Sequence, residues 1–299
     1  MLSLYHRKRL ILGTASFEKN YGINKDKNLK KEEIIKIFKL CKKNNIRFLD
    51  SANQYKENNL RKFSNSLKDF KIIYKVNLNL KKKTYKQIKN KIFFLLKSFL
   101  RKNKIKKVYC IMIHSEDSML SNNSYNLYKI ISLIKKEGLA EKIGISGYNL
   151  EKILKIFEKF RFDILQFPYN LFDQRLNRTN VLNFFKKKKT EIHIRSIFLQ
   201  GIFFINAKKL PSYFNKWKKL FQKLNKNLIN NKLSILNLCL SHAFNLNYGK
   251  KKIIFGIQSI DNLNEIKNVK LNYNKKFIKK LKSNDKKLIL PYLWNIKKK

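Results

Sequence analysis

The feature that most constrains this chain is a short apolar run that recurs eight times, with an amphipathic stretch after each run. The runs are rich in Ile, Leu, Val and Phe and end at polar residues or glycine, as buried strands do. They lie at residues 9–15, 46–50, 71–77, 107–114, 142–148, 163–170, 191–198 and 252–258. Strands that are covered on both faces have this pattern, so the runs indicate a parallel sheet flanked by helices.

The stretches between the runs carry apolar residues at helical spacing. In residues 29–45, Ile34, Ile37, Phe38 and Cys41 recur at that spacing with Lys and Glu between them. Further helices are predicted at residues 56–67, 85–100, 125–136, 150–160, 177–187, 212–228 and 233–245, and near Asn262 and Lys275. Gly138 is placed to end the helix that precedes it.

Eight consecutive strand–helix units predict an α/β fold, a (β/α)8 TIM barrel, because eight parallel strands close into a barrel of about this length. A doubly wound open sheet is the structural alternative. No linker rich in Pro, Gly or Ser interrupts the chain, so residues 1–299 are predicted to form a single domain.

The formal net charge of +50 would normally suggest a polyanionic partner. The excess is mostly Lys and is spread over the whole length, whereas nucleic-acid readers favour clustered Arg. We therefore expect no specific nucleic-acid partner. Cys41, Cys110 and Cys239 are far apart and form no metal-ligand or disulfide pattern. No apolar segment is long enough to span a membrane, so we expect a cytoplasmic protein without membrane insertion or metal.

Polar side chains stand where the predicted strands end, and in a barrel these ends meet at one mouth. The residues at these ends, with Tyr55 in the loop after the second strand, are Asp50, Tyr55, Lys75, His114, Ser146, Gln166, Arg195, Ser196, Gln258 and Ser259. Several glycines lie in or just after predicted strands, where a missing side chain lets a ligand or a neighbouring backbone approach: Gly13, Gly144, Gly147, Gly201 and Gly256.

With these residues in place, the sequence resembles the aldo/keto reductase family from Leu10 to about Val269. The resemblance lies in the motifs Leu-Gly-Thr-Ala (12–15), Leu-Asp-Ser-Ala-Asn-Gln-Tyr (49–55), Lys75, Ile-His (113–114), Gly-Leu-Ala-Glu-Lys-Ile-Gly-Ile-Ser (138–146), Gln-Phe-Pro-Tyr-Asn (166–170), Arg-Ser-Ile-Phe-Leu-Gln-Gly (195–201) and Phe-Gly-Ile-Gln-Ser (255–259). The motifs at 12–15 and 195–201, with Asn-Tyr-Gly-Ile at 20–23, are most similar to bacterial members associated with cell-surface polysaccharide or sugar-nucleotide pathways.

The resemblance implies a catalytic set of four residues. Tyr55 would protonate a carbonyl oxygen, and Lys75 would stabilise the phenolate and so lower the pKa of Tyr55 from about 10. Asp50 would hold Lys75 in an ion pair, and His114 would orient the carbonyl.

The resemblance also implies NADP(H) or NAD(H) as cofactor. The implied cofactor-binding residues are Gly13, Thr14, Ser146, Gln166, Arg195, Ser196, Gly201, Gly256, Gln258, Ser259 and Glu265. Arg195 stands where the family often has an aromatic ring against the nicotinamide. Three places depart from the family pattern. The loop 56–59 is Lys-Glu-Asn-Asn, Gly147 replaces a common Asn, and the usual 2′-phosphate partners are Gln258 and Asn262, which leaves the cofactor preference open.

We therefore expect an oxidoreductase that interconverts a carbonyl and an alcohol on a small, sugar-like substrate. Two other classes are weighed against it. A cofactor-binding barrel could serve as a regulatory or scaffold subunit, which the intact set of Asp50, Tyr55, Lys75 and His114 disfavours. A basic nucleic-acid-binding protein is disfavoured by the dispersed Lys. The oligomeric state is left open by the sequence.

Overall fold

Eight parallel strands close into a barrel in the computed structural model, which describes residues 1–17, 22–23, 29–55 and 58–296. Neighbouring strands pair in chain order, and β1 pairs with β8 to close the ring. The strands are β1 (Leu10–Gly13), β2 (Phe48–Ala52), β3 (Lys71–Val76), β4 (Val108–Ile113), β5 (Ala140–Ser146), β6 (Ile164–Pro168), β7 (Glu191–Arg195) and β8 (Lys251–Phe255). The predicted (β/α)8 TIM barrel is confirmed, and the open doubly wound sheet was the wrong alternative.

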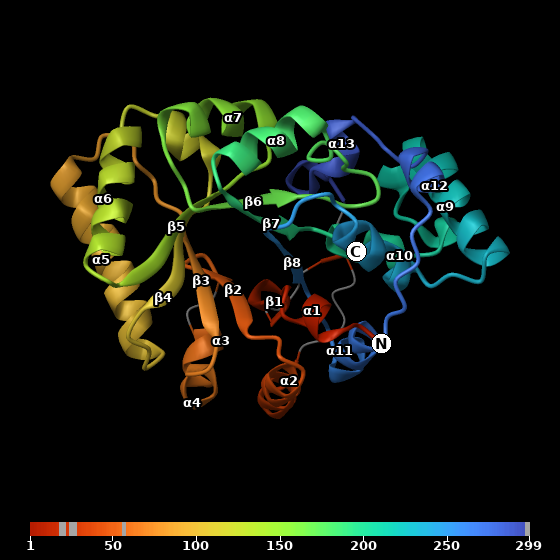
Figure 1. Cartoon of the computed structure of the whole chain (residues 1–299), viewed down its shortest axis with the longest axis horizontal. Helices are drawn as coiled ribbons and strands as arrows, with labels where there is room; N and C mark the ends of the chain where they lie inside the picture. The colour runs from red at the N-terminus through yellow and green to blue at the C-terminus, as the bar shows by residue number, and fades with distance from the viewer. Residues whose placement is uncertain (18–21, 24–28, 56–57, 297–299) are drawn as a thin grey trace.

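Helices surround this barrel (Figure 1). The α-helices are α1 (Leu4–Arg7), α2 (Lys31–Lys43), α3 (Asn58–Arg61), α4 (Ser64–Leu67), α5 (Tyr85–Lys102), α6 (Ser124–Lys136), α7 (Leu150–Lys159), α8 (Thr179–Lys187), α9 (Lys218–Asn230), α10 (Ile235–Phe244), α11 (Ile260–Lys267), α12 (Lys275–Lys279) and α13 (Lys286–Ile289). Short 3-10 segments are η1 (Thr14–Phe17), η2 (Glu116–Leu120), η3 (Leu199–Phe204), η4 (Ala207–Lys209), η5 (Ser212–Trp217) and η6 (Pro291–Leu293).

Several elements differ from the predictions in their bounds or their type. β5 begins at Ala140, before the predicted start, because Ala140 still pairs with Val108 of β4. The helix predicted at 56–67 is two short helices, α3 and α4, over its described part; residues 56–57 lie outside the described residues. The helix predicted at 212–228 is η5 followed by α9, and α1 was not predicted. Gly138 ends α6 at φ +75°, as predicted.

The apolar core has an inner and an outer layer. The inner layer lies inside the barrel and consists of Ile11, Ile73, Tyr109, Cys110, Met112, Ile164 and Ile254. The outer layer packs the amphipathic faces of the helices against the outward side chains of the strands. Because successive strand side chains alternate between these layers, the inward residues of each strand end lead into the mouth of the barrel.

The base of the barrel is closed by a polar cluster around Glu191 of β7. Its carboxylate accepts hydrogen bonds from Lys142 Nζ (2.5 Å) and Tyr109 Oη (2.9 Å), and its other oxygen contacts His193 Nε2 (2.8 Å). These bonds hold the pKa of Glu191 well below its ordinary value although burial alone would raise it. The cluster fills this end of the barrel with paired charges, although His193 Nδ1 has no hydrogen-bond partner among the described residues.

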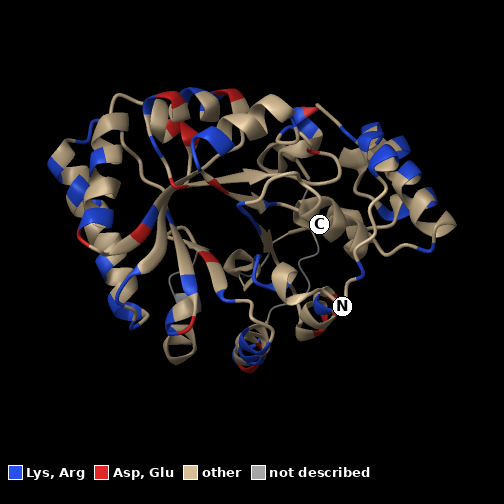
Figure 2. Ribbon diagram, viewed as in Figure 1, with Lys and Arg blue, Asp and Glu red and all other residues tan. Residues whose placement is uncertain are grey.

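Lys and Arg lie on outer helices on several sides of the barrel (Figure 2). No helix within the described parts of the chain has the length and apolar character needed to cross a bilayer.

Candidate active site

A cavity of about 590 Å³ opens among the C-terminal ends of the strands. This volume is in the range of small-molecule and cofactor sites. Most of the predicted site residues line it: Gly13, Asp50, Tyr55, Lys75, His114, Gln166, Arg195, Ser196, Gly201, Gly256, Gln258 and Glu265. The barrel therefore brings together residues that are more than two hundred positions apart in the chain.

The most tightly bound part of the cavity wall is the pair formed by Asp50 of β2 and Lys75 of β3. Both side chains are almost fully buried, and Lys75 Nζ donates to Asp50 Oδ2. Gln166 of β6 joins them, since its Nε2 donates to Asp50 Oδ1 (2.8 Å). Burial alone would lower the pKa of Lys75, but the Asp50 carboxylate outweighs it and raises that pKa. Lys75 is therefore a stable buried cation.

Tyr55 follows β2 and lies beside this cation, with its ring centroid 5.5 Å from Lys75 Nζ. The expected net lowering of its pKa is not found. Burial raises the pKa of Tyr55 by more than the charge and hydrogen bonding of Lys75 lower it. The phenol is therefore protonated at neutral pH, which is the form that can donate a proton.

His114 directly follows β4 and lines the same cavity. Burial and the positive charges of Lys75 and Arg195 lower the pKa of His114 to about 3, so the ring is neutral. None of the described residues forms a hydrogen bond with its side chain, and its Nδ1 is buried without a partner. The ring therefore has hydrogen-bonding capacity that no described residue uses, and it borders the cavity.

Three predicted cofactor residues do not line the cavity. Thr14 Oγ1 donates to the Asp50 carbonyl (3.0 Å), and Ser146 Oγ donates to Gln166 Oε1 (3.4 Å). Ser259 caps α11 by accepting from the Asn262 amide (3.3 Å). Each of these hydroxyls thus holds a residue that lines the cavity.

Packing explains the glycine at position 147, where the resemblance would place Asn. A Cβ at this position would lie 2.7 Å from Ile153 Cδ1 and 3.2 Å from Glu116 Oε2. The Gly147 carbonyl instead accepts a hydrogen bond from Arg195 Nη2 (3.0 Å). Gly201 has φ +88°, which a glycine adopts without strain.

Sequence reasoning missed the aromatic part of the cavity wall, which consists of Tyr148, Phe198 and Phe204. Tyr148 follows β5, and the two Phe residues follow β7. Their position just after strand ends was the available signal. An aromatic residue there is more often core than ligand wall, so the pattern alone could not select them.

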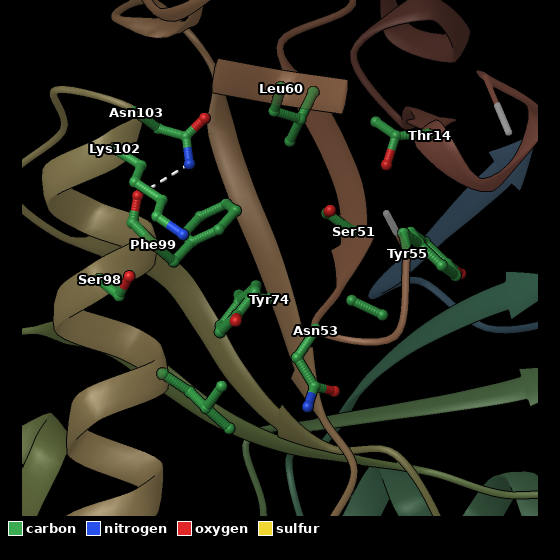
Figure 3. Close-up of a pocket in the computed structure, with 12 residues that line it drawn as sticks. Thr14, Ser51, Asn53, Tyr55, Leu60, Tyr74, Ser98, Phe99, Lys102 and Asn103 are labelled. Atoms are coloured by element: carbon green, nitrogen blue, oxygen red, sulfur yellow. Dashed lines mark hydrogen bonds between the residues drawn. The ribbon is translucent and has the colours of Figure 1, made fainter. Parts of the chain in front are cut away.

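A second, much smaller pocket lies between the Tyr55 loop and α5 (Figure 3). Its volume of about 30 Å³ has room for roughly one water. Asn103 at its edge donates to the Phe99 carbonyl (2.8 Å), and its Oδ1 has no partner among the described residues. The pocket is too small for a substrate.

Comparisons with known proteins identify the family and the fold. The sequence model of the aldo/keto reductase family matches residues 9–286. A search of curated protein sequences finds no match.

Similar solved structures include several reductases. An aldo-keto reductase of Bacillus halodurans in its holo form has a TM-score of 0.69 and 16% identity, covering 91% of each chain. A glycerol dehydrogenase of Gluconobacter oxydans has a TM-score of 0.64 and 14% identity, covering 91% of this chain and 90% of that one. An aldo-keto reductase of the silkworm Bombyx mori has a TM-score of 0.64 and 13% identity, covering 91% of this chain and 82% of that one. At these identities the likeness concerns the fold.

Proposed function

Since the chain belongs to the aldo/keto reductase family, we propose that it is an NAD(P)(H)-dependent oxidoreductase that interconverts a carbonyl and an alcohol. The observation that carries the proposal is the buried Asp50–Lys75 pair next to Tyr55, in a cavity that His114 also lines. This is a cation, a protonated phenol and a neutral imidazole at one opening. A barrel that only binds a ligand has no need of such a costly buried pair.

The residues present fit a nicotinamide dinucleotide. His114 offers an unpartnered ring, and the cavity continues from the Asp50–Lys75 pair to Gly256, Gln258 and Glu265. Arg195 and Gln166 would hold the nicotinamide end, and the residues after β8 the adenosine end. One of the two Gln166 amide hydrogens is used by Asp50, which leaves the other for a ligand. The bound cofactor would supply the hydride that reaches the carbonyl carbon.

The chain's own residues would handle the proton. The Tyr55 hydroxyl gives its proton to the carbonyl oxygen, and the neutral His114 ring donates a hydrogen bond to the same oxygen. Lys75 stabilises the phenolate that is left behind, and Asp50 keeps Lys75 charged. Proton positioning of this kind contributes ~10²–10⁴ in rate.

The substrate is proposed to be small and sugar-like. Support comes from the similarity of residues 12–15 and 195–201 to enzymes of polysaccharide and sugar-nucleotide pathways. Gln54 and Asn77 add hydrogen-bonding groups to the cavity wall, which suit hydroxylated molecules. A fold neighbour from Gluconobacter oxydans is a dehydrogenase of glycerol, itself a polyol.

The proposal is tested by following NADH and NADPH oxidation with aldehydes, ketoses and nucleotide sugars. We expect turnover of at least one of these substrate classes. The Tyr55→Phe variant, prepared in the same way, should show no turnover. Cofactor binding without turnover of any carbonyl would instead support a non-catalytic role.

Because His114 is neutral, we predict that kcat/KM changes little with pH on the acid side of neutrality. A histidine with an ordinary pKa of about 6.5 would titrate in the middle of the physiological range. Because the pKa of His114 is lowered to about 3, the ring gains its proton only in stronger acid. We expect kcat/KM to show no His transition between about pH 5 and pH 8. A transition near 6.5, with circular dichroism unchanged over the same range, would contradict the neutral assignment.

The cofactor preference is predicted from Gln258 and Asn262, which line the cavity. Both are neutral, and charge-assisted hydrogen bonds to phosphate are roughly twice as strong as neutral ones. The protein should therefore discriminate only weakly against NADH. Gln258→Arg should tighten NADPH by roughly 1–3 kcal/mol and leave NADH nearly unchanged. Fluorescence titration measures the affinities for NADPH and NADH. Gln222→Arg is the control for the added positive charge, because Gln222 is exposed on α9. Equal changes in the affinities for NADH and NADPH would show that the 2′-phosphate does not bind at Gln258.

A further inference from the structure

Arg195 is a cation in the cavity wall without a carboxylate partner among the described residues. Its Nη2 donates to the Gly147 carbonyl (3.0 Å) and its Nη1 to Ser196 Oγ (3.5 Å). Its Nε is buried with no hydrogen-bond partner. Partly buried charges are usually paired with an opposite charge. The described hydrogen bonds of Arg195 go to neutral oxygens instead, so its positive charge is left uncompensated.

Tyr148 fixes the guanidinium in place of a carboxylate. The Arg195 Cζ lies over the Tyr148 ring, 3.9 Å from its centroid. A cation in this position is attracted by the ring face without losing its charge. Arg195 is therefore held firmly and remains fully positive toward the cavity.

The position of Tyr148 is itself set by two charged side chains, the buried Glu116 and the partly buried Arg175. Glu116 Oε1 accepts from the Tyr148 amide (3.0 Å), and Arg175 Nη1 donates to its carbonyl (2.7 Å). Arg175 is in turn paired with Asp173 through two bonds. These carboxylates are engaged with Tyr148 and its support, and neither forms an ion pair with Arg195.

The charge of Arg195 reaches the reacting groups. It contributes to the lowered pKa of His114 and opposes the rise in the pKa of Tyr55. Lys75 and Asp50 also act on His114, but they are paired with each other. Of these three charged groups, Arg195 is the one whose hydrogen bonds go only to neutral partners.

We propose that Arg195 makes this site favour the reduced, uncharged nicotinamide over the oxidised, positively charged one. The inference rests on the proposed function, which puts a nicotinamide at this centre. An oxidised ring there would be repelled by the positive charge of Arg195, whereas a reduced ring carries no charge and would not be repelled. A neutral aromatic side chain in place of Arg195 would lack this discrimination.

The test is the ratio of the dissociation constants of NADP+ and NADPH, measured by calorimetry without substrate. Arg195→Gln removes the charge, and Arg195→Lys keeps it. Arg161→Gln, at an exposed position on the outside of the barrel, makes the same change in net charge elsewhere. A loss of packing weakens both redox forms equally, so only a charge effect moves the ratio.

In the wild type we expect NADPH to bind more tightly than NADP+. The ratio should fall on the order of tenfold in Arg195→Gln, a change between the like-charge repulsion expected at a few ångströms in bulk water and the larger one expected near a protein surface. It should stay within about twofold in the other two variants. If Arg195→Gln leaves the ratio unchanged while the wild type binds both forms, this inference alone is wrong. If the wild type binds neither form, the proposed function fails and the inference fails with it.

Discussion

Tyr55→Phe is expected to abolish turnover while the dissociation constants of NADPH and NADH stay within about twofold. The change removes one oxygen and keeps the ring, which lies beside Lys75. Under the proposed mechanism the hydroxyl acts only while the proton moves, so its loss lowers kcat and kcat/KM together. A loss of ~10²-fold or more is the scale of a missing general acid. Steady-state kinetics and fluorescence titration measure the two quantities.

Tyr125→Phe is the matched control, since Tyr125 lies exposed on α6 and its ring meets Phe160 edge-on. It should leave both turnover and binding unchanged. Retention of more than about a tenth of kcat/KM in Tyr55→Phe, far above the loss expected for a general acid, would contradict the proton-donor role. Weaker cofactor binding in Tyr55→Phe would show that the hydroxyl contacts the cofactor.

The barrel could be predicted from the sequence because its strands are covered on both faces. Each predicted strand is an apolar run with a polar end, and neither property depends on distant contacts. The short helix α1 could not be predicted in this way. It spans one turn, Leu4–Arg7, and depends on a cap from Ser3. A pattern of that length carries almost no periodic signal.

The candidate site was predictable as a set of strand ends, but not in its contacts. Thr14, Ser146 and Ser259 have the residue types of ligand-binding groups, and the sequence does not show that their hydroxyls bond to neighbouring residues instead. Tyr148 was missed because its partner Arg195 comes from a different strand end. The raised pKa of Tyr55 was missed for a similar reason, since burial by the surrounding elements cannot be read from the loop itself.

The second large effect is expected at the Asp50–Lys75 pair. Variants of this pair should differ in how their stability and their activity respond. Asp50→Asn leaves the Lys75 ammonium buried opposite a neutral amide, and Lys75→Met leaves the Asp50 carboxylate with Gln166 as its remaining side-chain donor among the described residues. Removal of one partner of a buried pair costs ~3–5 kcal/mol of unfolding free energy. Lys75→Met removes the cation beside Tyr55, and Asp50→Asn removes the carboxylate that raises the pKa of Lys75 and holds its side chain in place. Each variant should therefore lose ~10²-fold or more in kcat/KM.

The double variant Asp50→Asn/Lys75→Met should regain most of the lost stability without regaining activity. No buried charge is left unpaired in it, and replacing both members of a buried pair by neutral groups of similar size is often close to neutral. Urea unfolding of the four proteins measures the stabilities, and kcat/KM on one substrate measures the activities. A double variant as unstable as the sum of the single variants would mean that the two side chains do not act as a pair. Recovery of activity along with stability would mean that the pair maintains the fold, and that the positive charge of Lys75 has no part in the proton transfer from Tyr55.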